Sequence, residues 1–198
     1  MNINSILIVD DEVTIRDMLT EMLKDEASKV IAVESGTQAL KALSREKFDI
    51  VITDVNMPDM NGYQLLEYIK FVDPIVPVII MTGYNSIYDV QEAMEKGAVE
   101  YIVKPFKKEE IDTYIDRAIL LSLAKRNKIL NKYITVANNL IDKSSEPNKD
   151  ELVVIGRRLL KYIDAPTLCL EPSDIELAQK IVNESSYSSN NPNRVSNM

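Results

Sequence analysis

The stretch ILIVDDE, residues 6–12, joins an apolar run directly to a group of acidic residues. Four consecutive aliphatic residues without a polar neighbour are typical of a strand that is covered on both faces of a parallel sheet. The acids that follow are Asp10, Asp11 and Glu12. The stretch therefore predicts a central strand with carboxylates at its carboxyl end.

The same alternation of strand and helix repeats along the chain. Short apolar runs predict further strands at 30–33, 50–53, 78–81 and 101–103. Apolar residues at helical spacing predict helices over 13–23, 36–43, 65–69 and 90–94, and another that begins near Glu109. Five strands that alternate with helices predict a doubly wound α/β domain with one parallel sheet.

Ligands of such sheets lie beyond the carboxyl ends of the strands. The residues at these ends are Asp10 and Asp11, Asp54, Thr82, and Lys104 with Pro105. Clustered carboxylates repel one another unless a cation lies among them, and hard oxygen ligands suit Mg²⁺. A carboxylate is also a feasible nucleophile for phosphoryl transfer, while an ammonium and a hydroxyl can hold phosphoryl oxygens.

Each of these residues also has an ordinary structural explanation. A lone aspartate after a strand is usually a turn or helix-cap residue. Thr82 beside Gly83 fits a turn, and an isolated Lys104 fits a solvated side chain. Their joint occurrence at four strand ends favours a phosphoryl-transfer site over these separate explanations.

Residues 1 to about 120 resemble the receiver domain of bacterial two-component response regulators. Four segments carry the resemblance, namely ILIVDDE (6–12), ITDVNMPDMNG (52–62), MTGY (81–84) and YIVKPF (101–106). The resemblance implies a flavodoxin-like fold followed by an all-α C-terminal extension.

The resemblance also implies a role for each site residue. Asp54 would be phosphorylated. Mg²⁺ would be bound directly by Asp11 and Asp54, through water by Asp10, and by the backbone carbonyl of Asn56. Thr82 and Lys104 would bind the phosphoryl group, and the Lys104–Pro105 peptide bond would be cis. Tyr101 would be the switch aromatic, with a half-buried strand tyrosine as the alternative. A bulky Tyr84 would slow hydrolysis of the phosphorylated state.

Composition excludes several classes of protein. The chain has no histidine, which excludes a histidine kinase or a histidine phosphotransfer domain. Up to Leu120 there are 22 acidic and 12 basic residues, which argues against nucleic-acid binding by this part. One cysteine, Cys169, and the lack of a long apolar segment predict a cytoplasmic protein that does not enter the membrane.

The last third of the chain gives weaker signals. We predict a receiver domain at 1–122, an extension of its last helix at 123–143, a small helical region at 144–186 and a disordered tail at 187–198. No Gly or Pro interrupts 109–142, where Ile115, Ser122, Ile129 and Val136 form a stripe. This stripe either packs on its own chain or meets a partner, and Ser122, Lys125 and Lys132 argue against a continuous two-stranded coiled coil.

The main hypothesis is a response regulator that receives a phosphoryl group on Asp54 from a sensor histidine kinase or phosphotransfer protein. It would then engage an unidentified output protein or form a phosphorylation-dependent homodimer. The alternative is a transcriptional regulator that binds DNA through the helical C-terminal region, although no clear basic recognition helix is present. A hydrolase of external phosphate esters, or a receiver detached from a larger effector, are further alternatives. Apart from self-catalysed transfer to Asp54 and its reversal, we expect no enzymatic activity.

Overall fold

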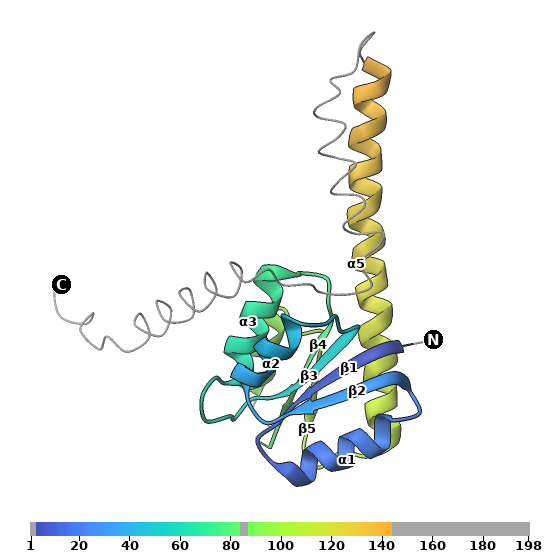
Figure 1. Ribbon diagram of the computed structural model, residues 1–198. Coiled ribbons are helices and arrows are strands. Elements are labelled where there is room, and N and C mark those ends of the chain that lie inside the picture. Colours follow the sequence, from blue (N-terminus) through green and yellow to red (C-terminus); the bar gives the residue numbers. More distant parts are fainter. Residues whose placement is uncertain (1–2, 84–86, 144–198) are drawn as a thin grey trace, which may run out of the picture.

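A computed structural model describes residues 3–83 and 87–143 of this chain. Five strands alternate with five helices (Figure 1). The strands are β1 Ile3–Val9, β2 Ala27–Val33, β3 Ile50–Asp54, β4 Val78–Thr82 and β5 Glu100–Val103. The helices are α1 Val13–Leu23, α2 Gly36–Leu43, α3 Gly62–Val72, α4 Ile87–Glu95 and α5 Lys108–Lys143. The predictions for Tyr84, for 144–186 and for 187–198 lie outside the described residues.

All four strand pairs are parallel, and the sheet order is β2-β1-β3-β4-β5. This is the doubly wound five-stranded sheet that the sequence predicts. Strand β1 begins earlier than expected, at Ile3, because Ile3 already pairs with Ala27 of β2. Strands β3 and β4 each continue by one residue, so that Asp54 and Thr82 are the last residues of their strands rather than loop residues.

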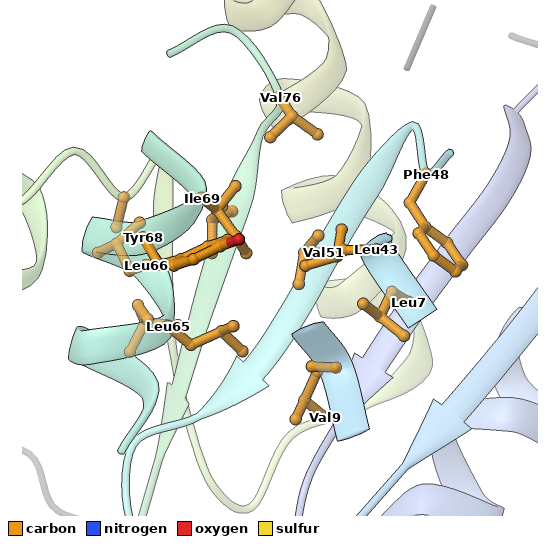
Figure 2. Close-up of a cluster of buried hydrophobic side chains, with 14 of the residues drawn as sticks. Leu7, Val9, Leu43, Phe48, Val51, Leu65, Leu66, Tyr68, Ile69 and Val76 are labelled. Atoms are coloured by element: carbon orange, nitrogen blue, oxygen red, sulfur yellow. The ribbon is translucent and has the colours of Figure 1, made fainter. Parts of the chain in front are cut away.

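Alternate residues of each strand enter two separate cores. One core lies between the sheet and α2, α3 and α4 and contains Leu7, Val51 and Ile80 (Figure 2). The other lies between the sheet and α1 and α5 and contains Ile8, Ile52 and Met81. Because both faces are covered, every residue of β3 and β4 is buried, which explains their uninterrupted apolar sequences.

Helix α5 packs on the second core with its first half only. Ile111, Ile115 and Ala118 are buried there, and the helix then continues past the sheet to Lys143 (Figure 1). The buried Ser122 hydroxyl donates to the Ile75 carbonyl at 3.0 Å, and the Lys125 ammonium donates to the Pro74 carbonyl at 2.6 Å. These two polar residues therefore face the body of their own chain.

None of the described helices is at once long enough and apolar enough to cross a membrane.

Candidate functional site

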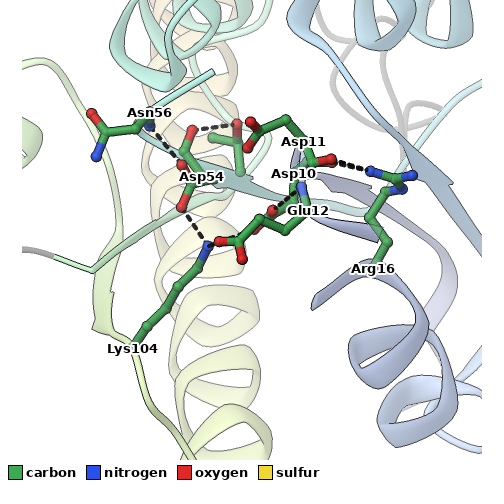
Figure 3. A network of polar contacts seen from close by, with 8 residues as sticks. Asp10, Asp11, Glu12, Arg16, Asp54, Asn56 and Lys104 are labelled. Atoms are coloured by element: carbon green, nitrogen blue, oxygen red, sulfur yellow. Dashed lines mark hydrogen bonds and ion pairs between the residues drawn. The ribbon is translucent and has the colours of Figure 1, made fainter. Parts of the chain in front are cut away.

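The carboxyl ends of β1, β3 and β5 bring Asp10, Asp54 and Lys104 together. The ammonium of Lys104 lies 2.7 Å from Oδ2 of Asp10 and 2.7 Å from Oδ1 of Asp54 (Figure 3). The two carboxylates come from adjacent strands, and the lysine reaches them from the first residue after β5. The Lys104 ammonium therefore bridges two carboxylates at the carboxyl ends of the strands.

Burial makes this cluster electrostatically unusual. The side chain of Asp10 is fully buried, that of Asp54 is 5% exposed and that of Lys104 is 13% exposed. Burial raises the pKa of Asp54, and the hydrogen bond from Lys104 offsets this only in part. Burial by itself lowers the pKa of Lys104, but the hydrogen bonds to Asp10 and Asp54 outweigh it, so the lysine pKa is raised.

Backbone amides hold the remaining carboxylate oxygens. The amide of Glu12 donates to Oδ1 of Asp10 at 2.9 Å, and the amide of Asn56 donates to Oδ2 of Asp54 at 2.6 Å. Each carboxylate is thus fixed on one side by its own loop and on the other by Lys104 (Figure 3). This arrangement orients Asp54 for a reaction at the strand end.

The other predicted site residues occupy the same edge in different ways. Thr82 is buried at the end of β4, and its carbonyl accepts the amide of Lys104 at 2.8 Å. The Lys104–Pro105 peptide bond is cis. Tyr101 is 8% exposed and belongs to the core beneath α4, so it is more buried than the half-buried tyrosine weighed above.

Asp11 differs in burial from the other acidic residues of the site. Asp11 is exposed, unlike Asp10 and Asp54. Within 3–83 and 87–143, no three acidic, histidine or cysteine side chains are arranged to hold a metal ion. The oxygen-only donor set nevertheless suits Mg²⁺, and two of its carboxylates already share one cation, the Lys104 ammonium.

Two residues escaped the sequence reasoning. Arg16, one helical turn into α1, donates through Nη1 to the carbonyls of Asp10 at 2.7 Å and Asp11 at 2.9 Å. It therefore secures the acidic loop from its backbone side. Gly62 lies against the backbone of Asp54, since a Cβ atom at residue 62 would be 2.1 Å from the Asp54 carbonyl oxygen. The sequence carries no clear signal for the Arg16 contact, because its partners are backbone carbonyls. Gly62 is the last residue of the receiver-like segment 52–62, but the sequence does not reveal its contact with Asp54.

Comparison with known proteins agrees with this geometry. Residues 6–116 match the family model of the response regulator receiver domain. The response regulator protein FleR of Pseudomonas aeruginosa is 43% identical over 102 residues, which are 52% of this chain and 22% of FleR. The transcriptional regulatory protein ZraR of Escherichia coli K12 is 35% identical over 114 residues, which are 58% of this chain and 26% of ZraR.

A third relative extends beyond the receiver. A putative NtrX-like response regulator of Rickettsia bellii is 32% identical over 168 residues, which are 81% of this chain and 35% of that protein. The chain thus spans between a fifth and about a third of the length of these curated relatives.

A solved structure shows the same domain. The chemotaxis protein CheY4 of Vibrio cholerae superposes with a TM-score of 0.56 at 30% identity and covers 59% of this chain and 98% of its own. The family match, the relatives and the doubly wound sheet with its acidic strand ends lead to one identification. This chain belongs to the response regulator receiver domain family.

Proposed function

We propose that Asp54 accepts a phosphoryl group from the phosphohistidine of a sensor histidine kinase or phosphotransfer protein. A carboxylate oxygen of Asp54 would form a bond to phosphorus while the bond from phosphorus to the histidine nitrogen breaks, leaving an acyl phosphate and a free imidazole. The observation that carries the proposal is the shared ammonium of Lys104, 2.7 Å from both Asp10 and Asp54. It supplies a positive charge where phosphoryl oxygens would arrive.

Mg²⁺ fits this reaction. Asp10, Asp11, Asp54 and the backbone carbonyl of Asn56 would hold it, and the ion would neutralise charge on the phosphoryl oxygens. Exposed Asp11 is free of the burial that restrains Asp10, so it is the carboxylate best able to turn toward an arriving ion. The amide of Asn56 keeps Asp54 oriented throughout.

The phosphorylated state would then shift the population of two arrangements of the domain. Thr82 would hydrogen-bond a phosphoryl oxygen, and Tyr101 on the neighbouring strand would respond. The signalling face would consist of α4, β5 and the first part of α5, roughly 87–117. It would engage an output protein or a second copy, in the cytoplasm, without turnover of any external substrate.

The test compares Asp54→Asn with Asp59→Asn, an exposed aspartate five residues further along the same segment. Each full-length variant is incubated with Mg²⁺ and acetyl phosphate, and intact-mass spectrometry detects the added phosphoryl group. We expect the wild type and Asp59→Asn to be labelled and Asp54→Asn to remain unlabelled. Labelling of Asp54→Asn at the wild-type level would refute the proposal.

A second candidate is DNA binding by a longer assembly that contains this receiver. The similarity to ZraR, a transcriptional regulatory protein, favours it, although the chain matches only 26% of that protein. Salt-dependent retention on DNA would support this candidate for the chain itself. Absence of retention at low salt would leave protein contacts as the output.

A further inference from the structure

Arg16 contacts the acidic loop, residues 10–12, in a different way from Lys104. Its Nη1 donates to the backbone carbonyls of Asp10 and Asp11, at 2.7 Å and 2.9 Å. Within the described part of the chain, the Arg16 guanidinium pairs with no carboxylate, whereas the Lys104 ammonium lies 2.7 Å from Oδ2 of Asp10. Figure 3 shows Arg16 and Lys104 on different sides of the loop. Arg16 therefore holds the loop by its backbone and leaves the carboxylates open to other ligands.

The backbone of the acidic loop is bound by the start of α1. The carbonyl of Glu12 accepts the amides of Ile15 and Arg16, both at 3.1 Å. The carbonyls of Asp10 and Asp11 accept the Arg16 side chain, so residues 15 and 16 bind all three carbonyls of the loop. Glu12 is the N-cap residue of α1, and its side chain makes no capping hydrogen bond of the kind that often joins a loop to a helix. Arg16 supplies the side-chain link instead.

The side chain of Asp11 depends on this backbone for its direction. Asp11 is exposed, and no described residue forms a hydrogen bond or ion pair with its carboxylate. The carboxylate of Asp10, by contrast, is held by the Glu12 amide at 2.9 Å and by Lys104. A change in the backbone angles of Asp11 would therefore turn its side chain without breaking any contact of the carboxylate itself.

One nitrogen of Arg16 fixes both backbone angles of Asp11. The carbonyls of residues 10 and 11 belong to the two peptide planes that flank the Asp11 Cα atom. Because each peptide is planar, holding both carbonyls sets the two rotations between them. Nη1 of an arginine carries two N–H groups, so it can donate one to each carbonyl. Arginine presents these donors in a rigid planar group, whereas a lysine ammonium is compact and strongly hydrated.

The charge of Arg16 acts in the opposite direction, since a guanidinium repels a cation bound nearby. Arg16 is partly exposed, so solvent and salt screen this repulsion. The hydrogen bonds to the carbonyls are made at contact distance and are screened less than a repulsion that acts across the loop. We therefore expect the orientation of Asp11 to outweigh the repulsion, and a variant that keeps the charge separates the two effects.

We propose that Arg16 is a positioning residue for Mg²⁺, because it fixes the backbone that directs the carboxylate of Asp11. The inference rests on the proposed function, which places Mg²⁺ at Asp10, Asp11 and Asp54. Arg16 contacts the loop carbonyls and not these carboxylates, so it sets the affinity for the ion and leaves the phosphoryl transfer itself unchanged. Its loss raises the Mg²⁺ concentration that the protein needs and does not lower the rate at saturating Mg²⁺.

Isothermal titration calorimetry of the full-length, metal-free protein with magnesium chloride tests this role. We expect the Kd for Mg²⁺ to rise about tenfold in Arg16→Met, an effect typical of residues that orient metal ligands. Arg45→Met, at an exposed arginine beyond the end of α2, removes the same charge and should change this Kd by less than about twofold. Arg16→Lys keeps the charge and should recover part of the lost affinity.

The rate of labelling by acetyl phosphate at rising Mg²⁺ concentration supplies a second measurement. For Arg16→Met, the half-saturating Mg²⁺ concentration should rise together with the Kd, while the rate at saturating Mg²⁺ stays within about twofold of the wild-type rate. A merely structural role of Arg16 would lower stability in urea without this separation of affinity from rate.

An unchanged or tighter Kd in Arg16→Met, or slower labelling that Mg²⁺ does not restore, would overturn the proposal. If urea unfolding shows that Arg16→Met does not fold, Arg16→Lys takes its place, and a wild-type Kd in that variant would count against the role of Arg16. A wild type that binds Mg²⁺ but is not labelled would refute only the proposed phosphoryl transfer, because calorimetry measures binding of the ion without that reaction.

Discussion

The backbone of Gly62 lies so close to that of Asp54 that a Cβ atom at residue 62 would sit 2.1 Å from the carbonyl oxygen of Asp54. The amide of Gly62 also donates to the Val55 carbonyl at 2.9 Å, which draws the start of α3 onto the end of β3. Only glycine permits this approach, because the atom in the way is backbone and cannot rotate aside.

Gly62→Ala should therefore destabilise the domain by about 3 kcal/mol or more, since overpacking against backbone forces β3 and α3 apart. Urea unfolding measures the loss. Gly83→Ala is the control, because a Cβ there meets nothing within 4 Å, and it should change the free energy of unfolding by less than about 0.5 kcal/mol. An equal loss of unfolding free energy in the two variants would show that the close approach of residue 62 to Asp54 does not exclude a larger side chain there.

The buried carboxylate of Asp54 gives a pH-dependent prediction. Burial raises its pKa, so the folded state binds more protons than the unfolded state as the pH rises through the acidic range. Stability must then fall with rising pH across this window and level off above the raised pKa. Asp54→Asn lacks this titration, and without added metal it should be more stable than wild type at neutral pH.

Urea unfolding of both proteins in EDTA, from the acidic range to neutral pH, checks this sign. The difference in unfolding free energy by which Asp54→Asn exceeds the wild type should shrink as the pH is lowered. An advantage that stays constant with pH would mean that the burial of Asp54 does not disfavour its charged form.

Lys104 forms ion pairs with Asp10 and Asp54 at 2.7 Å and with Glu12 at 3.6 Å. Lys104→Ala should weaken binding of beryllofluoride with Mg²⁺ by about tenfold or more, because a charge-assisted contact to the phosphoryl oxygens is lost. It should also abolish the change in hydrogen exchange of β5 that bound beryllofluoride causes. Hydrogen exchange of residues 100–103 measures this response.

The control for Lys104 is Lys107→Ala, a change at an exposed lysine three residues away. It should leave both the binding and the hydrogen-exchange response at wild-type levels. If Lys104→Ala shows the wild-type response of β5 at saturating beryllofluoride, the coupling role assigned to this lysine is wrong.

Lys70 on α3 supplies an independent test of electrostatics far from the strand ends. Burial, helped by repulsion from Lys125, lowers its pKa to about 8, and its ammonium donates to the Val76 carbonyl. Between pH 8 and the ordinary lysine value of 10.5, the unfolded state therefore binds more protons, and stability must rise with pH.

Relative to Lys70→Met, the wild type should gain up to about 3 kcal/mol across this window, a limit set by the size of the pKa difference. Urea unfolding at the two ends of the window measures the gain. Lys41→Met, at an exposed position of α2, serves as the matched control for loss of a lysine. The wild type should gain more stability across this window relative to Lys70→Met than relative to Lys41→Met. Equal gains relative to the two variants would contradict the burial of the Lys70 charge.

The sequence alone determined the sheet and the residues at its edge. Continuous aliphatic runs are required where both faces of a strand are covered, so 6–9, 50–53 and 78–81 could be recognised as central strands. Parallel strands place their carboxyl ends together, which was enough to predict that Asp10, Asp54 and Lys104 meet. The absence of Gly and Pro likewise predicted that α5 continues beyond the sheet.

Only the tertiary structure decided how these parts touch. It set Lys104 between two carboxylates, left Asp11 exposed and brought Gly62 against Asp54. It also decided which side of α5 is covered, since Ser122 meets the Ile75 carbonyl from 47 residues away along the chain. A helical repeat defines the possible faces of a helix, but its rotation on the sheet is set by contacts between residues distant in sequence, and no local pattern contains them.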